Sequence, residues 1–309
     1  MSAAHAFVDF VRAANSVDLC VMHRGEVVVD EQWAAPVDVA STQKSIVSVL
    51  VGIAVARGDL RLDDRVTDHL GAGWTGRAEV ATEGDITLRH LLSMTSGLGD
   101  ALEFVTAPGE RWDYNLVVYP TVKRVLRAAT NRDLDAITAE WVTGPLGMTA
   151  SRWQPRVWND RLPAIFKGAF FYPDGTPMEA LVSPARDLVR FGDAVMRGCA
   201  GLGVDDAYRQ AMTRPSQQLN PAYGLLWWVN GSPFFFAPRL AVRVEGPFFP
   251  GVPADAFAAL GAGDQCCVVV PSLELVVART GGPAGEASAA GSGFVRELAR
   301  RAVSLFTDR

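Results

Sequence analysis

The sequence predicts an α/β protein in which an antiparallel sheet, built from both ends of the chain, carries helices on its faces and encloses an inserted, mostly helical lobe. Strand-like segments occur near both ends, helical periodicity dominates between them, and no internal repeat or low-complexity linker intervenes. The 309 residues, of which 49% are hydrophobic, are enough for a large core. We therefore expect one compact unit with an α/β lobe from residues 1–60 and 220–309 and a mostly helical lobe from residues 61–219.

The N-terminal elements follow from local patterns. A short helix is predicted over residues 3–14, and two strands over 17–23 and 26–33 are joined by a turn at Arg24-Gly25. From Ser41 to Ala56 the side chains are apolar nearly all round, which indicates a buried helix that Gly58 ends.

The rest of the chain divides into a helical middle and a strand-rich end. Helical patterns in the middle cover residues 89–94, 117–130 and 133–142 and a helix begun by Ser183-Pro184, with few alternating strands between them. Strands are predicted over residues 224–230, 256–260, 266–270 and 273–279, and a last helix runs from about 285 to 306.

Composition and charge exclude several classes of function. The net charge of -5 and the scattered arginines provide no basic surface for nucleic acid. The N-terminus has Asp9 in its only apolar run and no early basic cluster, so we expect a cytoplasmic protein. Arg57 interrupts the longest apolar run, so no membrane segment is expected. Cysteine and histidine spacing predicts neither a metal site nor another cofactor, and favours buried free thiols.

An S-x-x-K motif, Ser41-Thr42-Gln43-Lys44, stands where a strand-rich segment turns into the buried helix. A spacing of three places Ser41 and Lys44 on one helix face. A serine hydroxyl is a poor nucleophile until a base removes its proton, and a lysine amine shielded from water can do so. The motif therefore predicts a nucleophilic serine with a lysine partner.

The alternative is that Ser41 caps the helix and that the Lys44 ammonium reaches solvent. With 15 serines and three lysines, about 0.15 such pairs are expected by chance in the whole chain. The one pair that occurs opens a helix without an exposed polar face, where an unused ammonium is costly to bury. These observations favour catalysis.

Further motifs, taken together in their order and spacing, resemble the class C β-lactamase-like serine hydrolases. That family includes D-alanyl-D-alanine carboxypeptidases, short-chain esterases and aminohexanoate-oligomer hydrolases. The motifs are VASTQKSIVSVLVGIAVARGDLRLDDRV at 39–66, ITLRHLLSMTSGL at 86–98, PGERWDYN at 108–115, PLGM at 145–148, SPARDLVRFG at 183–192 and GAGDQ at 261–265. The resemblance covers nearly the whole chain. It implies a β-lactamase/transpeptidase-like fold with the active site between the lobes, Ser41 as nucleophile and Lys44 as its partner.

The family's second motif is Y-x-N, in which the tyrosine approaches the serine and serves as acid and base. Tyr114 matches that tyrosine, whereas Asn115 stands one place earlier than the family's asparagine. The resemblance thus implies that Tyr114 is the second proton carrier and makes Asn115 a candidate for substrate binding. The alternative for Tyr114 is a core aromatic whose hydroxyl meets backbone.

The family's third motif places a cation on a strand edge, where backbone N–H groups form the oxyanion hole. Here the candidate residues are Gly261, Ala262, Gly263, Asp264 and Gln265. Glycines suit a strand that passes close to a ligand, although a simple turn between strands is the alternative. Because Ala262 supplies no cation, we expect a small neutral ester or amide as substrate.

Two alternatives to a hydrolase of small esters or amides stay open, as does the role of one segment. The chain could instead be a β-lactamase or D,D-peptidase, or a binding module that keeps the pocket without turnover. In residues 231–251, four prolines and the glycines argue against a regular element, and five phenylalanines are too many for a solvated loop. This segment is expected either to form an extra core layer or to act as a lid near Ser41.

Overall fold

The computed structural model describes residues 2–77, 83–157, 177–238, 242–285 and 293–307. Six of its strands form one antiparallel sheet in the order β2-β1-β11-β10-β9-β6. Their bounds are β1 Ser16–His23, β2 Glu26–Gln32, β6 Trp228–Val229, β9 Phe257–Gly261, β10 Gln265–Val270 and β11 Leu275–Gly281. Because β1 pairs with β11, the two ends of the chain meet inside the sheet, which confirms the predicted architecture.

The first hairpin forms where the sequence predicts it. Arg24 and Gly25 have φ of 53° and 81°, the left-handed conformations that two-residue turns between antiparallel strands require. Six consecutive residues of β1 are buried, because β1 is a central strand covered on both faces. The edge strand β2 is mostly exposed.

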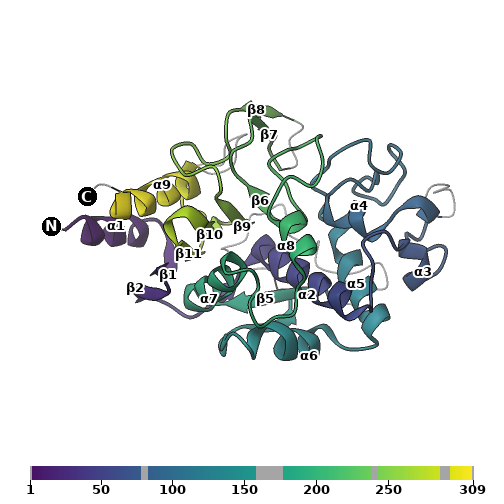
Figure 1. Ribbon diagram of the computed structural model, residues 1–309, viewed down its shortest axis with the longest axis horizontal. Coiled ribbons are helices and arrows are strands. Elements are labelled where there is room, and N and C mark those ends of the chain that lie inside the picture. Colours follow the sequence, from purple (N-terminus) through teal and green to yellow (C-terminus); the bar gives the residue numbers. More distant parts are fainter. Residues whose placement is uncertain (1, 78–82, 158–176, 239–241, 286–292, 308–309) are drawn as a thin grey trace.

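Helices cover both faces of the sheet. The terminal helices α1 (Ala3–Arg12) and α9 (Gly293–Thr307) pack beside each other, next to the two chain ends in Figure 1. The helix α7 (Ala185–Met196), which lies within residues 61–219, packs on β1, β10 and β11. In β11, Val276 lies close to Gly192 of α7, whereas Arg279 contacts Phe294 of α9. Side chains an odd number of residues apart point to opposite faces of a strand, so α7 and α9 cover opposite faces of the sheet.

The middle of the chain is mostly helical, as predicted, but it also contains strands that the sequence analysis missed. Its helices are α3 Val66–Leu70, α4 Leu88–Leu92, α5 Tyr119–Thr130, α6 Leu134–Thr138 and α8 Asp206–Met212, with a π-helical turn at Ala139–Thr143. A second sheet has the order β3-β5-β4, from Val37–Asp38, Glu179–Ser183 and Arg152–Pro155. These strands are short and pair over long sequence separations, so no local alternation reveals them.

The strand predicted over residues 224–230 is wrong except at its end, since only β6 pairs there with β9. Leu226 has a φ of 61°, and the Gly224 N–H donates to the Trp227 carbonyl at 2.9 Å, so a turn replaces the strand. The last helix begins at Gly293, and residues 286–292 of the predicted helix lie outside the described residues.

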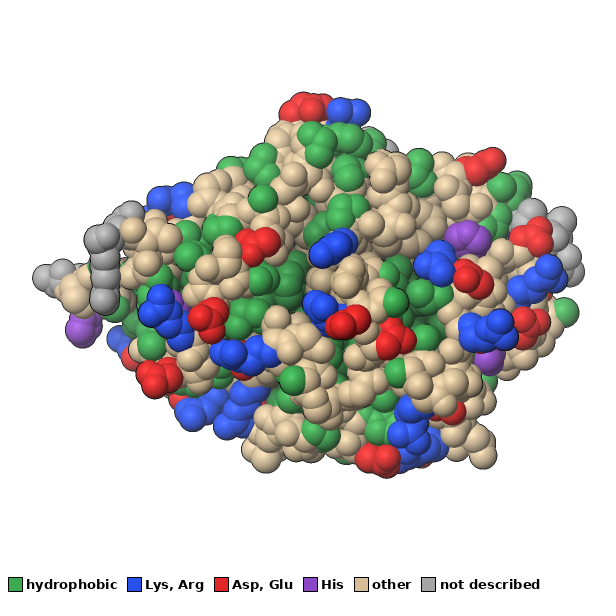
Figure 2. Space-filling model, viewed as in Figure 1, with side chains coloured by type: hydrophobic (Ala, Val, Ile, Leu, Met, Phe, Trp, Pro, Cys, Tyr) green, Lys and Arg blue, Asp and Glu red, His purple; other side chains and the backbone are tan. Residues whose placement is uncertain are grey.

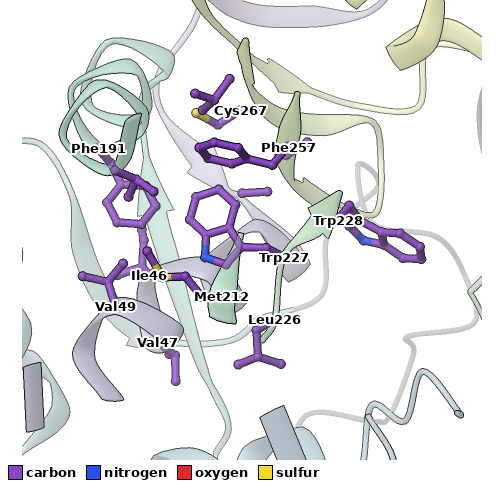
Figure 3. Packing of buried hydrophobic residues seen from close by; sticks show 14 of the residues in the cluster. Ile46, Val47, Val49, Phe191, Met212, Leu226, Trp227, Trp228, Phe257 and Cys267 are labelled. Atoms are coloured by element: carbon purple, nitrogen blue, oxygen red, sulfur yellow. The ribbon is translucent and has the colours of Figure 1, made fainter. Parts of the chain in front are cut away.

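The central helix α2 (Gln43–Arg57) connects the sheet to the helical middle. A 3₁₀ turn, Ala40–Thr42, precedes it, every residue from Gln43 to Ala54 is buried, and Gly58 ends it with a φ of 81°. Beside α2, Trp227 stacks on Phe191 and meets Phe257 edge-on at ring distances of 5.7 and 5.3 Å (Figure 3). The apolar surroundings of α2 thus hold the turn that carries Ser41 against a packed core.

The surface mixes both signs of charge. On the face shown in Figure 2, basic side chains lie beside acidic ones. Among the described residues, no helix has the length and apolar character needed to cross a bilayer.

Candidate active site

The turn that carries Ser41 is held in a strained conformation by an ion pair between the buried Asp38 and the half-buried Arg156. Ala40 has a φ of 49°, a left-handed conformation that costs a residue with a Cβ about 1 to 2 kcal/mol. Its N–H donates to Asp38 Oδ1 at 2.8 Å, and Arg156 donates to both oxygens of Asp38 at 2.8 and 3.1 Å. The pair therefore fixes the strained turn and leaves the Ser41 side chain partly exposed.

The Lys44 amine lies in hydrogen-bond contact with Ser41. Lys44 Nζ is 2.7 Å from Ser41 Oγ, and only 4% of Lys44 is exposed. Burial, and then the positive charges of Arg156 and Lys123, hold the pKa of Lys44 well below its usual range. Asp38 acts in the opposite direction and does not reverse the shift. The amine is consequently suited to accept a proton from Ser41.

Tyr114 lies beside the same two residues. Its ring centroid is 5.0 Å from Lys44 Nζ, and its hydroxyl is hydrogen-bonded to Ser41. Burial raises the pKa of Tyr114 to about 12, against a smaller lowering by the Ser41 contact. The phenol therefore keeps its proton at neutral pH and can give it up only to a strongly basic atom. The structure thus brings together the three residues that the sequence singles out.

Asn115 points away from this group. Its side-chain N–H₂ donates to the Leu98 and Gly99 carbonyls at 2.9 and 3.0 Å, and its oxygen accepts from the N–H groups of Val117 and Val118, both at 2.8 Å. These contacts use the amide to tie the 98–99 backbone to the start of α5. They favour a structural role, and the substrate-binding role remains a prediction.

The hairpin between β9 and β10 lies directly against the turn that carries Ser41. A Cβ at Gly261 would stand 2.4 Å from the Val39 carbonyl oxygen and 2.9 Å from Thr42 Oγ1, so only glycine allows this approach. At its tip, Gly263 and Asp264 have φ of 76° and 60°. Of the candidate oxyanion residues, Gly261 is thereby placed against the turn that carries Ser41.

Long-range hydrogen bonds fix this hairpin, and they use its polar side chains. Asp264 accepts from the Ala284 N–H at 2.8 Å, and Gln265 exchanges hydrogen bonds with the backbone of Gly281. The fully buried Arg279 donates to the carbonyls of Gly263 and Asp264 at 2.8 and 3.3 Å. These side chains are therefore occupied with backbone partners.

An aromatic cluster adjoins the phenol. Tyr114 lies 5.9 Å from Trp228 and 6.1 Å from Tyr223, ring to ring, and Trp228 stacks on Phe248 at 4.7 Å. Figure 3 shows Trp228 directed away from its neighbour Trp227, so consecutive side chains serve the site and the core. In the described part of residues 231–251, three phenylalanines are buried in the core, namely Phe235, Phe248 and Phe249. The expectation of no regular element is wrong there, because β7 (Phe234–Phe236) pairs with β8 (Arg243–Glu245). The segment is at least in part a core layer.

Several residues around the site were missed from the sequence. Asp38 and Arg156 are far apart in the chain, and neither belongs to a motif, so their pairing had no local signal. Lys123 did offer a signal, because it is one of three lysines in the chain and falls within a predicted helix.

The comparison with known proteins identifies the family of the chain. A family model described as Beta-lactamase matches residues 4–282. The chain belongs to the beta-lactamase family. No curated protein matches the sequence significantly. Membership of this family confirms the resemblance inferred from the motifs.

Solved structures of beta-lactamase-like proteins show the same fold at low sequence identity. A beta-lactamase from Mycobacterium bovis has a TM-score of 0.69 at 17% identity, covering 99% of this chain and 100% of that one. A penicillin binding protein from Bacillus halodurans has a TM-score of 0.68 at 16% identity and 99% coverage of both chains. EstCE1, described as a hydrolase with promiscuous acyltransferase activity, has a TM-score of 0.69 at 16% identity, covering 97% and 98%. The predicted fold class is therefore confirmed, whereas the roles of Ser41, Lys44 and Tyr114 remain predictions.

Proposed function

We propose that this member of the beta-lactamase family is a serine hydrolase that cleaves a small ester or amide through an acyl-enzyme on Ser41. The observation that carries the proposal is the 2.7 Å contact between Ser41 Oγ and the buried Lys44 amine. An amine with a lowered pKa, in contact with a partly exposed hydroxyl, is the pairing that nucleophilic catalysis by serine requires.

In the acylation step, Ser41 Oγ attacks the substrate carbonyl carbon and its proton passes to Lys44 Nζ. The bond to the leaving oxygen or nitrogen breaks, and the Tyr114 phenol donates its proton to that atom. The high pKa of Tyr114 suits it to this acid role rather than to the first deprotonation. The Lys44 ammonium then returns a proton to the phenolate, so both groups regain their starting states.

Deacylation reverses these roles with water as the nucleophile. Lys44 takes a proton from the water as its oxygen bonds to the acyl carbon, and Ser41 leaves with a proton from Tyr114. In both steps the carbonyl oxygen gains negative charge. Backbone N–H groups of the 261–265 hairpin, which lies against the Ser41 turn, are the proposed donors to that oxygen.

The preference for a neutral acyl group rests on the side chains of the same hairpin. Residues 261–265 include no lysine or arginine, and Asp264 and Gln265 are bonded to backbone. Nearby, Arg279 directs all three of its guanidinium nitrogens to backbone carbonyls or to Ser16. None of these groups is suited to bind a substrate carboxylate.

A covalent probe tests the proposed nucleophile. The folded protein is incubated with a fluorophosphonate, and digestion with mass spectrometry locates the adduct, which we expect on Ser41 and not on the Ser41→Ala variant. Two buried serines of α2 serve as internal controls that should stay unlabelled. Ser45 donates to the Leu226 carbonyl and Ser48 donates to the Leu225 carbonyl. Folded protein without an adduct would favour the binding module instead.

A further inference from the structure

A second buried lysine lies on α5, close to the proposed base. Lys123 is 2% exposed, its amine donates to the Glu179 carbonyl at 3.1 Å, and it lies 3.5 Å from the Glu179 carboxylate. Arg127, one turn along α5, pairs with the same carboxylate. Glu179 therefore provides a half-buried counter-charge that two cations share.

The ring of Tyr119 lies within reach of both lysine amines. Lys44 Nζ is 4.4 Å and Lys123 Nζ is 5.5 Å from the Tyr119 ring centroid, so the distance between the amines cannot exceed the sum of these values. Both side chains are almost completely buried, and water therefore screens their mutual repulsion only weakly. A positive charge on one amine disfavours a positive charge on the other.

We propose, on the basis of the function proposed above, that Lys123 is a positioning residue for the Lys44 base. Its positive charge, retained inside the protein by Glu179, disfavours a second ammonium at Lys44 and leaves that amine free to accept the Ser41 proton. Lys123 acts through Lys44 and does not contact the reacting atoms.

The other groups around Lys44 act in both directions. The titratable and charged side chains that face Lys44 come from several elements. They are Ser41 on the 3₁₀ turn, Asp38 on β3, Arg156 directly after β4, Tyr119 and Lys123 on α5, and Tyr114 before α5. The two tyrosine rings attract an ammonium, as does Asp38. Arg156 already pairs with Asp38 and itself repels the Lys44 ammonium. Lys123 is thus the second cation that opposes protonation of Lys44.

The charge on Lys123 depends on pH in the range where hydrolases are assayed. Burial, together with the positive charges of Arg156 and Arg127, lowers the pKa of Lys123 to about 7, and Glu179 opposes that fall. Below about pH 7 Lys123 is charged and repels a proton on Lys44, whereas above it this repulsion disappears. The charge on Lys123 therefore keeps Lys44 neutral under mildly acidic conditions, in which Lys44 would otherwise take up a proton.

Neutral variants of Lys123 test the inference through the pH dependence of activity. Lys123→Gln keeps a donor for the Glu179 carbonyl, and Arg127 remains to pair with the carboxylate. Because a like charge is removed, we expect the acidic limb of kcat/KM to move to higher pH by about half a unit or more. Activity at pH 6 should fall at least about threefold relative to that at pH 8.5.

Arg127→Gln is the matched control, because it removes a cation that lies on the same helix and pairs with the same carboxylate. It should not move the acidic limb to higher pH. An unchanged limb in folded Lys123→Gln and Lys123→Met would overturn the inference.

A second measurement is independent of activity. The chain has three lysines, so lysine labelled with carbon-13 at Cε gives three NMR signals, assigned with the Lys123→Gln and Lys167→Arg variants. We expect Lys44 to lose its proton at lower pH than Lys123, and its midpoint to rise in Lys123→Gln. The opposite order in the unsubstituted protein overturns the inference even if no Lys123 variant folds. The titration can be repeated in Ser41→Ala, whereas failure of the fluorophosphonate to label Ser41 overturns the proposed function alone.

Discussion

The two regions that meet at Ser41 are built in different ways. On the α2 side, the two groups proposed to react lie three residues apart, and one turn of helix brings Lys44 Nζ to 2.7 Å from Ser41 Oγ. On the side of the β9–β10 hairpin, the conformation depends on Arg279 and Gln265, which bond across the sheet to distant backbone. In the proposed mechanism, the first region supplies the reacting side chains and the second supplies backbone N–H groups. Substitutions in the first should therefore abolish chemistry, and those in the second should reduce it.

The largest effect is expected from Ser41→Ala. Removing the hydroxyl deletes the only proposed covalent site, so hydrolysis of nitrophenyl acetate should fall by more than about a thousandfold. Ser41 is partly exposed, and its loss leaves no cavity in the core, so the thermal unfolding midpoint should stay close to that of the unsubstituted protein. Residual activity near the original level would remove Ser41 from the mechanism.

Lys44→Arg should be nearly as damaging as Lys44→Ala, with a loss of about a hundredfold or more in kcat/KM. A guanidinium does not give up its proton and is too wide for a site that encloses an amine at 4% exposure. The two variants are compared on the same nitrophenyl ester. If Lys44→Arg is active, Lys44 is a structural charge and not a base.

Tyr114→Phe removes only the hydroxyl and keeps the ring that contacts Trp228 and Tyr223. If the phenol donates to the leaving group, turnover should fall by about a hundredfold, the usual scale for general acid catalysis. Stopped-flow measurement of acylation with esters of different leaving groups tests the role, since the loss should be smaller for nitrophenolate than for an alkoxide. A change below about threefold would make Tyr114 a core aromatic.

The same contrast explains what the sequence could predict. Ser41, Lys44 and the buried helix α2 are visible locally, because helical spacing alone sets their contact. The strands β4 and β5, the Asp38–Arg156 pair and the buried Arg279 depend on contacts between distant segments, so a single sequence carries no local sign of them.

Asn115 illustrates a middle case. The resemblance identified the residue as a candidate, and only its four hydrogen bonds to backbone indicate what the side chain does in this chain. A motif match therefore locates a residue near a site without fixing the direction of its side chain.

Gly261→Ala tests the backbone side of the site. The added Cβ would meet the Val39 carbonyl oxygen at 2.4 Å, so the hairpin must move away from the Ser41 turn. Because displaced oxyanion donors stabilise the transition state less well, we expect kcat to fall about tenfold. Gly84→Ala, where a Cβ meets nothing within 4 Å, is the matched control. An unaltered kcat in folded Gly261→Ala would exclude the hairpin from the oxyanion role.

The smallest effect concerns the acyl group and depends on both regions at once. The aromatic cluster beside Tyr114 gives the site an apolar border, and the hairpin side chains offer no free cation. Each buried CH₂ contributes roughly 0.8 kcal/mol, so butyryl esters should exceed acetyl esters several-fold in kcat/KM, measured with one common leaving group. Trp228→Ala, which removes a ring between Tyr114 and Phe248, should reduce this preference more than it reduces acetyl ester hydrolysis.

Carboxylated β-lactams should be poor substrates by comparison, because the described hairpin leaves their carboxylate without a cationic partner. If a penicillin or cephalosporin is turned over more efficiently than a butyryl ester, then an arginine elsewhere supplies the missing cation, and the neutral substrate class is wrong.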